Sequence, residues 1–222
     1  MKNKKRIQVI IPDRLKHPMG GMGVGLSHTI EGLQKDFDFD IIGFPEEGHP
    51  KNYYEVFNPL QSILHGSVTT LYGQIAYLER SIACSKPDII HAYDWSTYLA
   101  GVYAARHFNV PLVVTMQLSV NLLGELGIFY VNNPQAHDGI AIHRSICEME
   151  IYGLRQATKI IQISNAYRER FKVLPELDSK TVVIPHGINL SEWKASKKVR
   201  LPGKNSMKVV YIARFFLFEK EL

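Results

Sequence analysis

Residues 87–117 read PDIIHAYDWSTYLAGVYAARHFNVPLVVTMQ, and this stretch is the most informative about the fold of the chain. The apolar run at 88–91 predicts a short strand that a proline introduces. Apolar residues recur at helical spacing over 96–107, and the alanines and glycine between them suit a helix close against a sheet. The β-branched run at 110–115 indicates a strand buried on both faces. The stretch therefore predicts a strand, a helix and a second, parallel strand.

The carboxyl ends of these two strands are the first candidate site. A strand–helix–strand unit is right-handed almost without exception, so both strands end at the same edge of the sheet. Open α/β sheets bind their ligands at that edge. Tyr93, Asp94 and Trp95 follow the first strand, and Gln117 follows the second. We expect these four residues at the ligand-binding edge.

The rest of the chain repeats the alternation of strands and helices. Strands are predicted at 6–12, 37–44, 158–164 and 181–184, and helices at 67–85 and 135–156. The segments at 45–59 and 118–133 contain many glycine, proline and asparagine residues, so they are expected to be loops. We therefore predict an α/β fold, a Rossmann-like open parallel sheet with helices on both faces.

The last thirty residues differ in character from the rest. Residues 194–206 are basic and contain Pro202 and Gly203, which is typical of a linker, and residues 207–213 form a new apolar strand pattern. A first strand with no sheet to join indicates a domain cut off at its beginning. The expected organisation is a domain at 1–193, a linker at 194–206 and the start of a truncated second domain at 207–222.

Composition and charge limit the possible partners. The chain has 222 residues, is 45% hydrophobic and 21% charged, and carries a net charge of +5. Its basic residues are not interleaved with a recognition motif or exposed aromatic pairs, so we expect no nucleic-acid partner. The basic clusters at 2–6 and 194–208 leave two alternatives open: a solvated linker, or contact with an anionic membrane surface or a phosphorylated substrate.

The sequence carries no targeting or membrane signal. No apolar run reaches the roughly 20 residues of a membrane span, and no small-residue cleavage site follows the basic opening. Cys84 and Cys147 are too few for a disulfide framework. We expect a cytoplasmic protein.

A glycine-rich turn follows the first strand. Gly20, Gly21 and Gly23 lie in the run GGMGVG at 20–25, before a helical pattern. Such a turn lets the backbone approach a ligand and points free N–H groups at negative charge, although an ordinary tight turn is the alternative. The run does not fit G-x-G-x-x-G, and no acid closes the second strand, which disfavours a dinucleotide-dependent oxidoreductase.

Several segments, taken in order, resemble the N-terminal half of a GT-B glycosyltransferase of family 4, which is related to the glycogen and starch synthases. The segments are MGGMG at 19–23, KPDIIHAYDW at 86–95, IS at 163–164, VIPHGIN at 183–189 with Trp193, and YIAR at 211–214 with Lys220. In similar proteins two Rossmann-like domains face each other across a cleft. The N-terminal domain holds the acceptor, and the C-terminal domain holds the nucleotide sugar.

The resemblance implies roles for particular residues. Gly20, Gly21 and Gly23 would approach the transferred sugar or its diphosphate. Arg214 and Lys220 would neutralise the donor diphosphate, because positioned cations stabilise the charge that develops on a departing nucleoside diphosphate. The acceptor-side residues would be Tyr93, Asp94, Trp95, Gln117, His186 and Asn189. No metal and no cofactor are implied, since the nucleotide sugar is the donor substrate.

Departures from the family pattern leave the catalytic group open. Gln117 stands where a histidine is usual, and a neutral amide can bind a sugar hydroxyl but takes up no proton. His186 stands where asparagine is common, and Pro18 and Met19 precede the double glycine where the synthases have lysine. Asp94 and Gln117 are the catalytic candidates.

The hypothesis is therefore the N-terminal half of a glycosyltransferase. It would transfer a sugar from a nucleotide sugar to an acceptor hydroxyl, with retention, and would have little activity alone. The alternative is a module that binds a glycan or a partner without chemistry. His91 is interpreted as a buried ring with a hydrogen-bond partner, and Glu148 and Glu150 as solvated or paired.

Overall fold

The structure is a computed structural model that describes residues 4–56, 67–117, 119, 136–172, 174–188 and 190. Residues 1–187 form one compact unit and residues 188–222 form another. All helices and strands of the described residues belong to the first unit. The expected linker at 194–206, the expected strand at 207–213 and most of the expected loop at 118–133 lie outside the described residues.

The described residues form one seven-stranded sheet in which every pairing is parallel. In spatial order the strands are β3 (Tyr53–Glu55), β2 (Phe37–Gly43), β1 (Lys5–Ile10), β4 (Ile89–Tyr93), β5 (Leu112–Met116), β6 (Lys159–Gln162) and β7 (Thr181–Val183). The predicted strands and the predicted Rossmann-like α/β fold are confirmed. The short edge strand β3 lies in the segment at 45–59, which the sequence pattern indicated as a loop.

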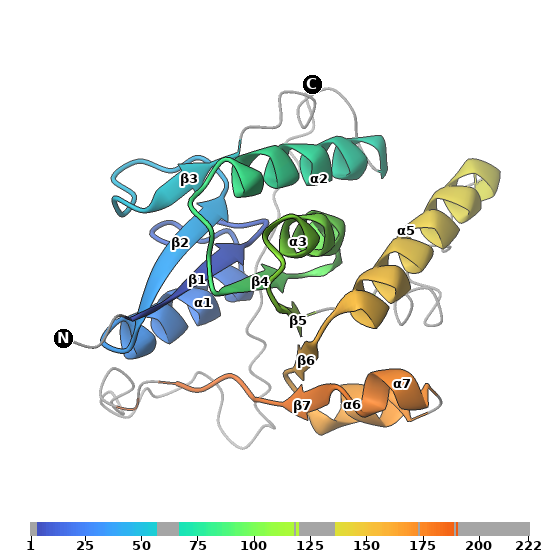
Figure 1. Ribbon diagram of the computed structural model, residues 1–222. Helices are drawn as coiled ribbons and strands as arrows, with labels where there is room; N and C mark the ends of the chain where they lie inside the picture. Colours follow the sequence, from blue (N-terminus) through green and yellow to red (C-terminus); the bar gives the residue numbers. More distant parts are fainter. Residues whose placement is uncertain are drawn as a thin grey trace, which may run out of the picture. The chain divides into compact units, whose positions relative to one another are not determined.

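Helices connect the strands and cover the sheet (Figure 1). They are α1 (Gly21–Leu33), α2 (Ser67–Ile82), α3 (Trp95–Phe108), α5 (Ala136–Gln156), α6 (Asn165–Phe171) and α7 (Pro175–Asp178). In Figure 1, α2, α3 and α5 lie on one side of the sheet and α1 lies on the other.

Two hydrophobic cores fill the space between the sheet and these helices. The side chain of Ile10 in β1 joins a core that includes Tyr98 of α3 and Leu154 of α5. Its neighbours Val9 and Ile11 join a second core with Leu26 of α1. Successive side chains of a strand point to opposite faces, so this alternation shows that both faces of the sheet are covered.

Helix α3 lies close against the sheet, as its small residues predict. A Cβ atom added to Gly101 would lie 2.9 Å from Cβ of Ala92 in β4 and 3.1 Å from Cδ1 of Leu112 in β5. The helix ends at Asn109, a left-handed C-cap with φ 52°, a conformation that asparagine tolerates better than most residues. The close contact holds α3 against β4 and β5, and the helix begins directly after its N-cap Asp94, where β4 ends.

Among the described residues, no helix is both long enough and apolar enough to cross a membrane.

Candidate functional site

A cavity of about 480 Å³ lies at the carboxyl ends of β1, β4 and β5. It joins the glycine-rich turn to Asp94, Gln117 and His186, which are far apart in the sequence. Its lining residues are Pro12, Asp13, Met19, Gly20, Gly21, Met22, Asp94, Gln117 and His186. The cavity thus brings the glycine-rich turn together with Asp94 and Gln117, two of the four residues expected at the ligand-binding edge.

Asp13 organises the glycine-rich turn from inside. Its side chain is buried, with a residue exposure of 3%. Oδ1 accepts hydrogen bonds from the backbone N–H of Arg14 at 2.8 Å and of Met19 at 2.7 Å, and Oδ2 accepts one from the N–H of Gly23 at 2.9 Å. Gly20, the N-cap of α1, has no side chain to serve as a cap. Asp13 therefore caps the helix from the preceding loop.

The three glycines of the turn have different structural roles. A Cβ on Gly23 would collide with the carbonyl oxygen of Arg14 and lie 2.7 Å from Cβ of Pro18, so no larger residue fits. A Cβ on Gly20 or Gly21 would meet nothing within 4 Å. Gly23 is thus needed for packing, whereas Gly20 and Gly21 leave the backbone open to a ligand.

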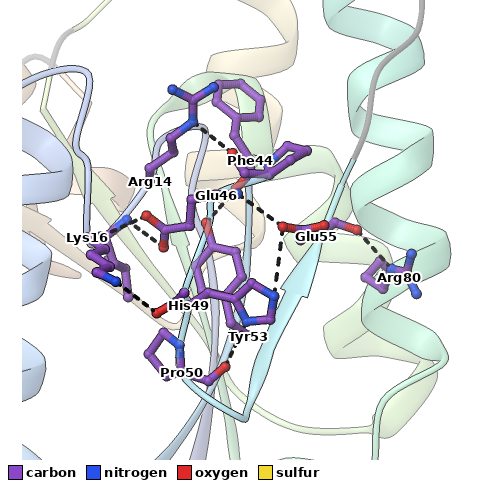
Figure 2. Close-up of polar contacts among 12 residues, drawn as sticks. Arg14, Lys16, Phe44, Glu46, His49, Pro50, Tyr53, Glu55 and Arg80 are labelled. Carbon is purple, nitrogen blue, oxygen red and sulfur yellow. Dashed lines mark hydrogen bonds and ion pairs between the residues drawn. The ribbon is translucent and has the colours of Figure 1, made fainter.

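A second buried carboxylate, that of Glu46, holds the same loop, and Figure 2 shows its contact with Lys16. Glu46 accepts hydrogen bonds from the backbone N–H groups of Leu15 at 3.2 Å, Lys16 at 2.8 Å and His17 at 3.2 Å. Beside it the Tyr53 hydroxyl donates to the carbonyl of Phe44 at 2.7 Å. Two carboxylates together hold six backbone N–H groups, which fixes the wall of the cavity.

The environment of Tyr53 reflects this concentration of negative charge. Burial raises the pKa of its hydroxyl well above the usual value, and the nearby carboxylates of Glu46 and Glu55 raise it further. The guanidinium Nε of Arg14 donates to the carbonyl of Pro45 at 2.8 Å. The Arg14 side chain is therefore held toward the β2 end of the sheet.

Sequence reasoning singled out neither Asp13 nor Glu46. Asp13 follows a proline at the end of the first strand, and an acid between a strand and a glycine-rich turn could have been recognised as a capping residue. Glu46 lies in a segment without a periodic pattern, so no local signal identifies it.

Asp94 forms the junction of β4 and α3. It is the N-cap of α3, and its Oδ1 accepts from the backbone N–H of Ser96 at 3.3 Å and from the Ser96 hydroxyl at 3.2 Å. Its own N–H donates to the carbonyl of Thr115 at 3.0 Å. Its φ angle is 68°, a conformation that costs a non-glycine residue about 1–3 kcal/mol and is concentrated at functional sites.

The Asp94 carboxyl is also electrostatically unusual. Burial raises its pKa to about 6, the hydrogen bonds from Ser96 oppose that rise, and Glu150 adds to it. A carboxyl that exchanges its proton near neutral pH suits general acid or base chemistry. Asp94 thus combines a cavity position, a strained backbone and a raised pKa.

Gln117 and His186 form a pair across the cavity. His186 Nε2 lies 2.8 Å from the side-chain oxygen of Gln117, although His186 follows β7 and Gln117 follows β5. The histidine ring also packs on α1, where a Cβ at Gly25 would lie 3.0 Å from its Nδ1 and Cε1. The Gln117 amide nitrogen is buried and has no hydrogen-bond partner among the described residues.

Two of the predicted acceptor-side residues, Tyr93 and Trp95, are not among the residues that line the cavity. Tyr93 is buried in the core on the α1 side of the sheet, with its ring 4.4 Å from that of His91. Trp95 is half-buried and packs against the other core. Asn189, Arg214 and Lys220 lie outside the described residues, so their predicted roles stay predictions.

His91 and Glu150 have the structural surroundings that the sequence suggested. His91 Nε2 lies 2.7 Å from the Thr115 hydroxyl, and burial lowers the pKa of its ring to about 4. Glu150 is buried, and its Oε2 accepts a hydrogen bond from the Ser119 hydroxyl at 3.2 Å. The interpretation of His91 as a ring with a partner is confirmed, and Glu150 is the paired residue rather than a solvated one.

Within the described part of the chain, no three histidine, cysteine, aspartate or glutamate side chains are placed to hold a metal ion.

Comparisons with known proteins agree with this architecture. The sequence profile of Glycosyltransferase Family 4 matches residues 19–192, which is more than half of the chain. None of the curated proteins compared with the chain matches it.

Solved structures with the same fold have low sequence identity to the chain. Sucrose-phosphate synthase from Thermosynechococcus elongatus is 17% identical, with a TM-score of 0.65 over 85% of this chain and 49% of that one. HepE from Anabaena, solved with UDP and glucose, is 16% identical, with a TM-score of 0.57 over 86% of this chain and 47% of that one. UDP-N-acetylglucosamine 2-epimerase from Rickettsia bellii is 12% identical, with a TM-score of 0.51 over 82% and 44%.

These matches define the class of the protein. The chain spans about half the length of the structures that it matches, and its fold is that of the N-terminal domain of GT-B glycosyltransferases. Because an epimerase shares this fold, the fold alone does not specify a reaction. The family profile matches more than half of the chain, so the chain belongs to glycosyltransferase family 4.

Proposed function

We propose that this chain is the acceptor-side half of an enzyme that transfers a sugar from a nucleoside diphosphate sugar to an acceptor hydroxyl, with retention of configuration. The observation that carries the proposal is the cavity at the carboxyl edge of the sheet, in a member of glycosyltransferase family 4. The structure of HepE with UDP and glucose supports a nucleotide sugar as the donor.

Different cavity residues bind and orient the acceptor. The Asp94 carboxyl accepts a hydrogen bond from the acceptor hydroxyl, and with its pKa raised to about 6 it is suited to exchange a proton with it. The Gln117 and His186 pair, which lines the same cavity, orients the acceptor. The open backbone at Gly20 and Gly21 allows the transferred sugar to approach closely.

The donor diphosphate requires positive charge from elsewhere in the protein. No lysine or arginine is among the described residues that line the cavity. We assign that role to Arg214 and Lys220, because cations positioned at the departing diphosphate stabilise the transition state. The 222-residue chain alone is expected to turn over little, because it spans about half the length of the matched structures.

The basic clusters at 2–6 and 194–208 are proposed as contacts to an anionic membrane surface. Pelleting with vesicles that contain anionic lipid tests this point. Binding that survives neutralisation of these lysines would contradict it.

Sugar transfer is the direct test of the proposed function. The full-length protein is incubated with UDP-sugars and a panel of glycans, and mass spectrometry and NMR identify the products. We expect a product with the anomeric configuration of the donor, and a large loss of rate in Asp94→Asn. Asp38→Asn removes the same charge from an exposed position and is the matched control.

A protein that binds glycans but yields no product from any nucleotide sugar would support the alternative, a binding module. One observation favours this alternative. Gln117 has an amide side chain, which takes up no proton, at a position where catalysis would use a proton acceptor.

A further inference from the structure

The backbone carbonyl of Thr115, in β5, accepts hydrogen bonds from two other elements. It accepts the backbone N–H of Asp94, at the end of β4, at 3.0 Å. It also accepts the side-chain hydroxyl of Tyr98, in α3, at 3.2 Å. Thr115 lies two residues before Gln117 in the chain. This one carbonyl therefore connects the phenol of a core tyrosine to the segment that carries both catalytic candidates.

The backbone of Asp94 depends on such contacts because its conformation is costly. Its φ of 68° and ψ of 150° lie in a region that is essentially restricted to glycine, and such a conformation persists only where the surrounding contacts over-determine it. The contacts that Ser96 and Thr97 make with Asp94 are local, within three residues along the chain. Among the described residues, the hydrogen bond to Thr115 is the one that joins Asp94 to a different strand.

The side chain of Tyr98 is closely packed. It is fully buried, in the core that also contains Leu154 of α5. A Cβ on Gly153 of α5 would lie 2.5 Å from Cβ of Tyr98 and 3.1 Å from its Cγ and Cδ2, so α5 passes the ring as closely as a glycine allows. The ring therefore has little freedom to move, and its hydroxyl stays where the Thr115 carbonyl accepts it.

The Tyr98 hydroxyl also keeps its proton. Burial raises its pKa well above the usual value, and the negative charges of Asp94 and Glu150 raise it further. A buried tyrosine hydroxyl usually has a hydrogen-bond partner, and here the acceptor is the Thr115 carbonyl. Because the phenol stays protonated throughout the neutral range, it donates this hydrogen bond whether or not Asp94 is ionised.

We infer that Tyr98 is a positioning residue for the transfer reaction. By holding the Thr115 carbonyl, its hydroxyl fixes the backbone of Asp94 and so the placement of the Asp94 carboxyl at the cavity. Tyr98 is not among the residues that line the cavity, so it acts through Asp94 and not by contact with a substrate. The inference rests on the proposed function, because Asp94 is the group that exchanges the acceptor proton there.

The variant Tyr98→Phe tests the inference, because it keeps the buried ring and removes the hydroxyl. Tyr77→Phe is the matched control. Tyr77 is buried in the same core, and its hydroxyl has no hydrogen-bond partner among the described residues. Both variants lose one buried oxygen atom, but Tyr98→Phe also loses the hydrogen bond to Thr115.

Hydrogen exchange measures the positioning without any substrate. In the ¹⁵N-labelled chain, we expect the amide of Asp94 to exchange about two- to tenfold faster in Tyr98→Phe, which is the effect of losing one hydrogen bond at this junction. The amide of Ile11, which donates to the carbonyl of Ile42 at 3.0 Å, is the internal reference for global stability. Tyr77→Phe should leave the ratio of the two exchange rates unchanged.

Transfer kinetics of the full-length protein show whether this positioning serves the reaction. We expect Tyr98→Phe to lower kcat about ten- to a hundredfold, because a misplaced reacting group is costly in the transition state. The KM values for the nucleotide sugar and the acceptor should change by less than about twofold, because the hydroxyl contacts neither of them. Tyr77→Phe should retain the kcat of the unmutated protein.

Each contrary result has a clear meaning. The inference is overturned if Tyr98→Phe does not change the exchange of Asp94 relative to Ile11, or if Tyr98→Phe and Tyr77→Phe have equal effects. An unchanged kcat also overturns it, and so does a loss of kcat/KM that lies mainly in KM. If the unmutated protein yields no product from any nucleotide sugar, the proposed function fails, and hydrogen exchange alone then decides whether Tyr98 positions Asp94.

Discussion

The replacement Gly23→Ala tests how the glycine-rich turn is built. The added Cβ would collide with the carbonyl oxygen of Arg14, and would lie 2.7 Å from Cβ of Pro18 and 2.8 Å from Oδ2 of Asp13. Two of these three contacts belong to the loop that precedes the helix, and the third is the carboxylate that caps it. The methyl group can be accommodated only if the helix and the loop separate.

The cost can be estimated from the contacts that are lost. Overpacking of this kind costs about 1–3 kcal/mol, and losing the hydrogen bond from the Gly23 N–H to the Asp13 carboxylate costs about 1.5–3 kcal/mol. Alanine recovers roughly 0.5–1 kcal/mol through its helix propensity. We expect Gly23→Ala to lower the free energy of unfolding by about 1.5–5.5 kcal/mol.

Gly32→Ala is the matched control, because Gly32 lies in the same helix and a Cβ there meets nothing within 4 Å. It should raise the free energy of unfolding by roughly 0.5–1 kcal/mol. Urea unfolding, followed by circular dichroism, measures both variants. If Gly23→Ala and Gly32→Ala had equal free energies of unfolding, the conclusion that contacts with Asp13 determine the structure of the turn would be wrong.

Three further predictions concern titration and the histidine pair. Burial raises the pKa of Asp94 to about 6, so ionisation of its carboxyl destabilises the fold as pH rises from 4 to 6. In urea unfolding at pH 8, Asp94→Asn should therefore be more stable than the unmutated protein by up to about 3 kcal/mol. This difference in the free energy of unfolding should vanish at pH 4. Burial lowers the pKa of His91 to about 4, so the stability that its neutral ring contributes is lost as pH falls from 6.5 to 4. In urea unfolding, the free energy of unfolding of His91→Gln should fall less over this pH range than that of the unmutated protein, by up to about 3 kcal/mol. Gly25→Ala should displace the His186 ring and weaken sugar binding in calorimetry, whereas Gly32→Ala should leave it unchanged.

The strand–helix–strand unit at 87–117 could be predicted because its signals are local. A buried strand, a helix with small residues and a β-branched strand each have a distinct pattern, and the handedness rule then places both strand ends at one edge. The strand β3 gave no such signal. It is three residues long and, among the described strands, pairs with β2 alone, so its conformation depends on a separate strand.

The candidate site was predictable only in part, for a geometric reason. A position after a strand predicts that a residue lies at the edge of the sheet, but not the direction of its side chain. Asp94 and Gln117 line the cavity, whereas Tyr93 and Trp95, their close neighbours, pack into the cores on opposite faces. The sequence also did not indicate that His186 is the partner of Gln117, because His186 follows a different strand and lies 69 residues along the chain.

The glycine-rich turn shows why a motif needs its surroundings before it acquires a chemical meaning. A phosphate-binding loop leaves its amides free for the ligand. In this chain Asp13 and Glu46 take six backbone N–H groups of residues 14–23 for themselves. The amides of Gly21 and Met22, for which the described residues provide no partner, then lie next to a negative charge. The two acids thus use backbone amides for the fold that a glycine-rich turn would otherwise leave free for a ligand.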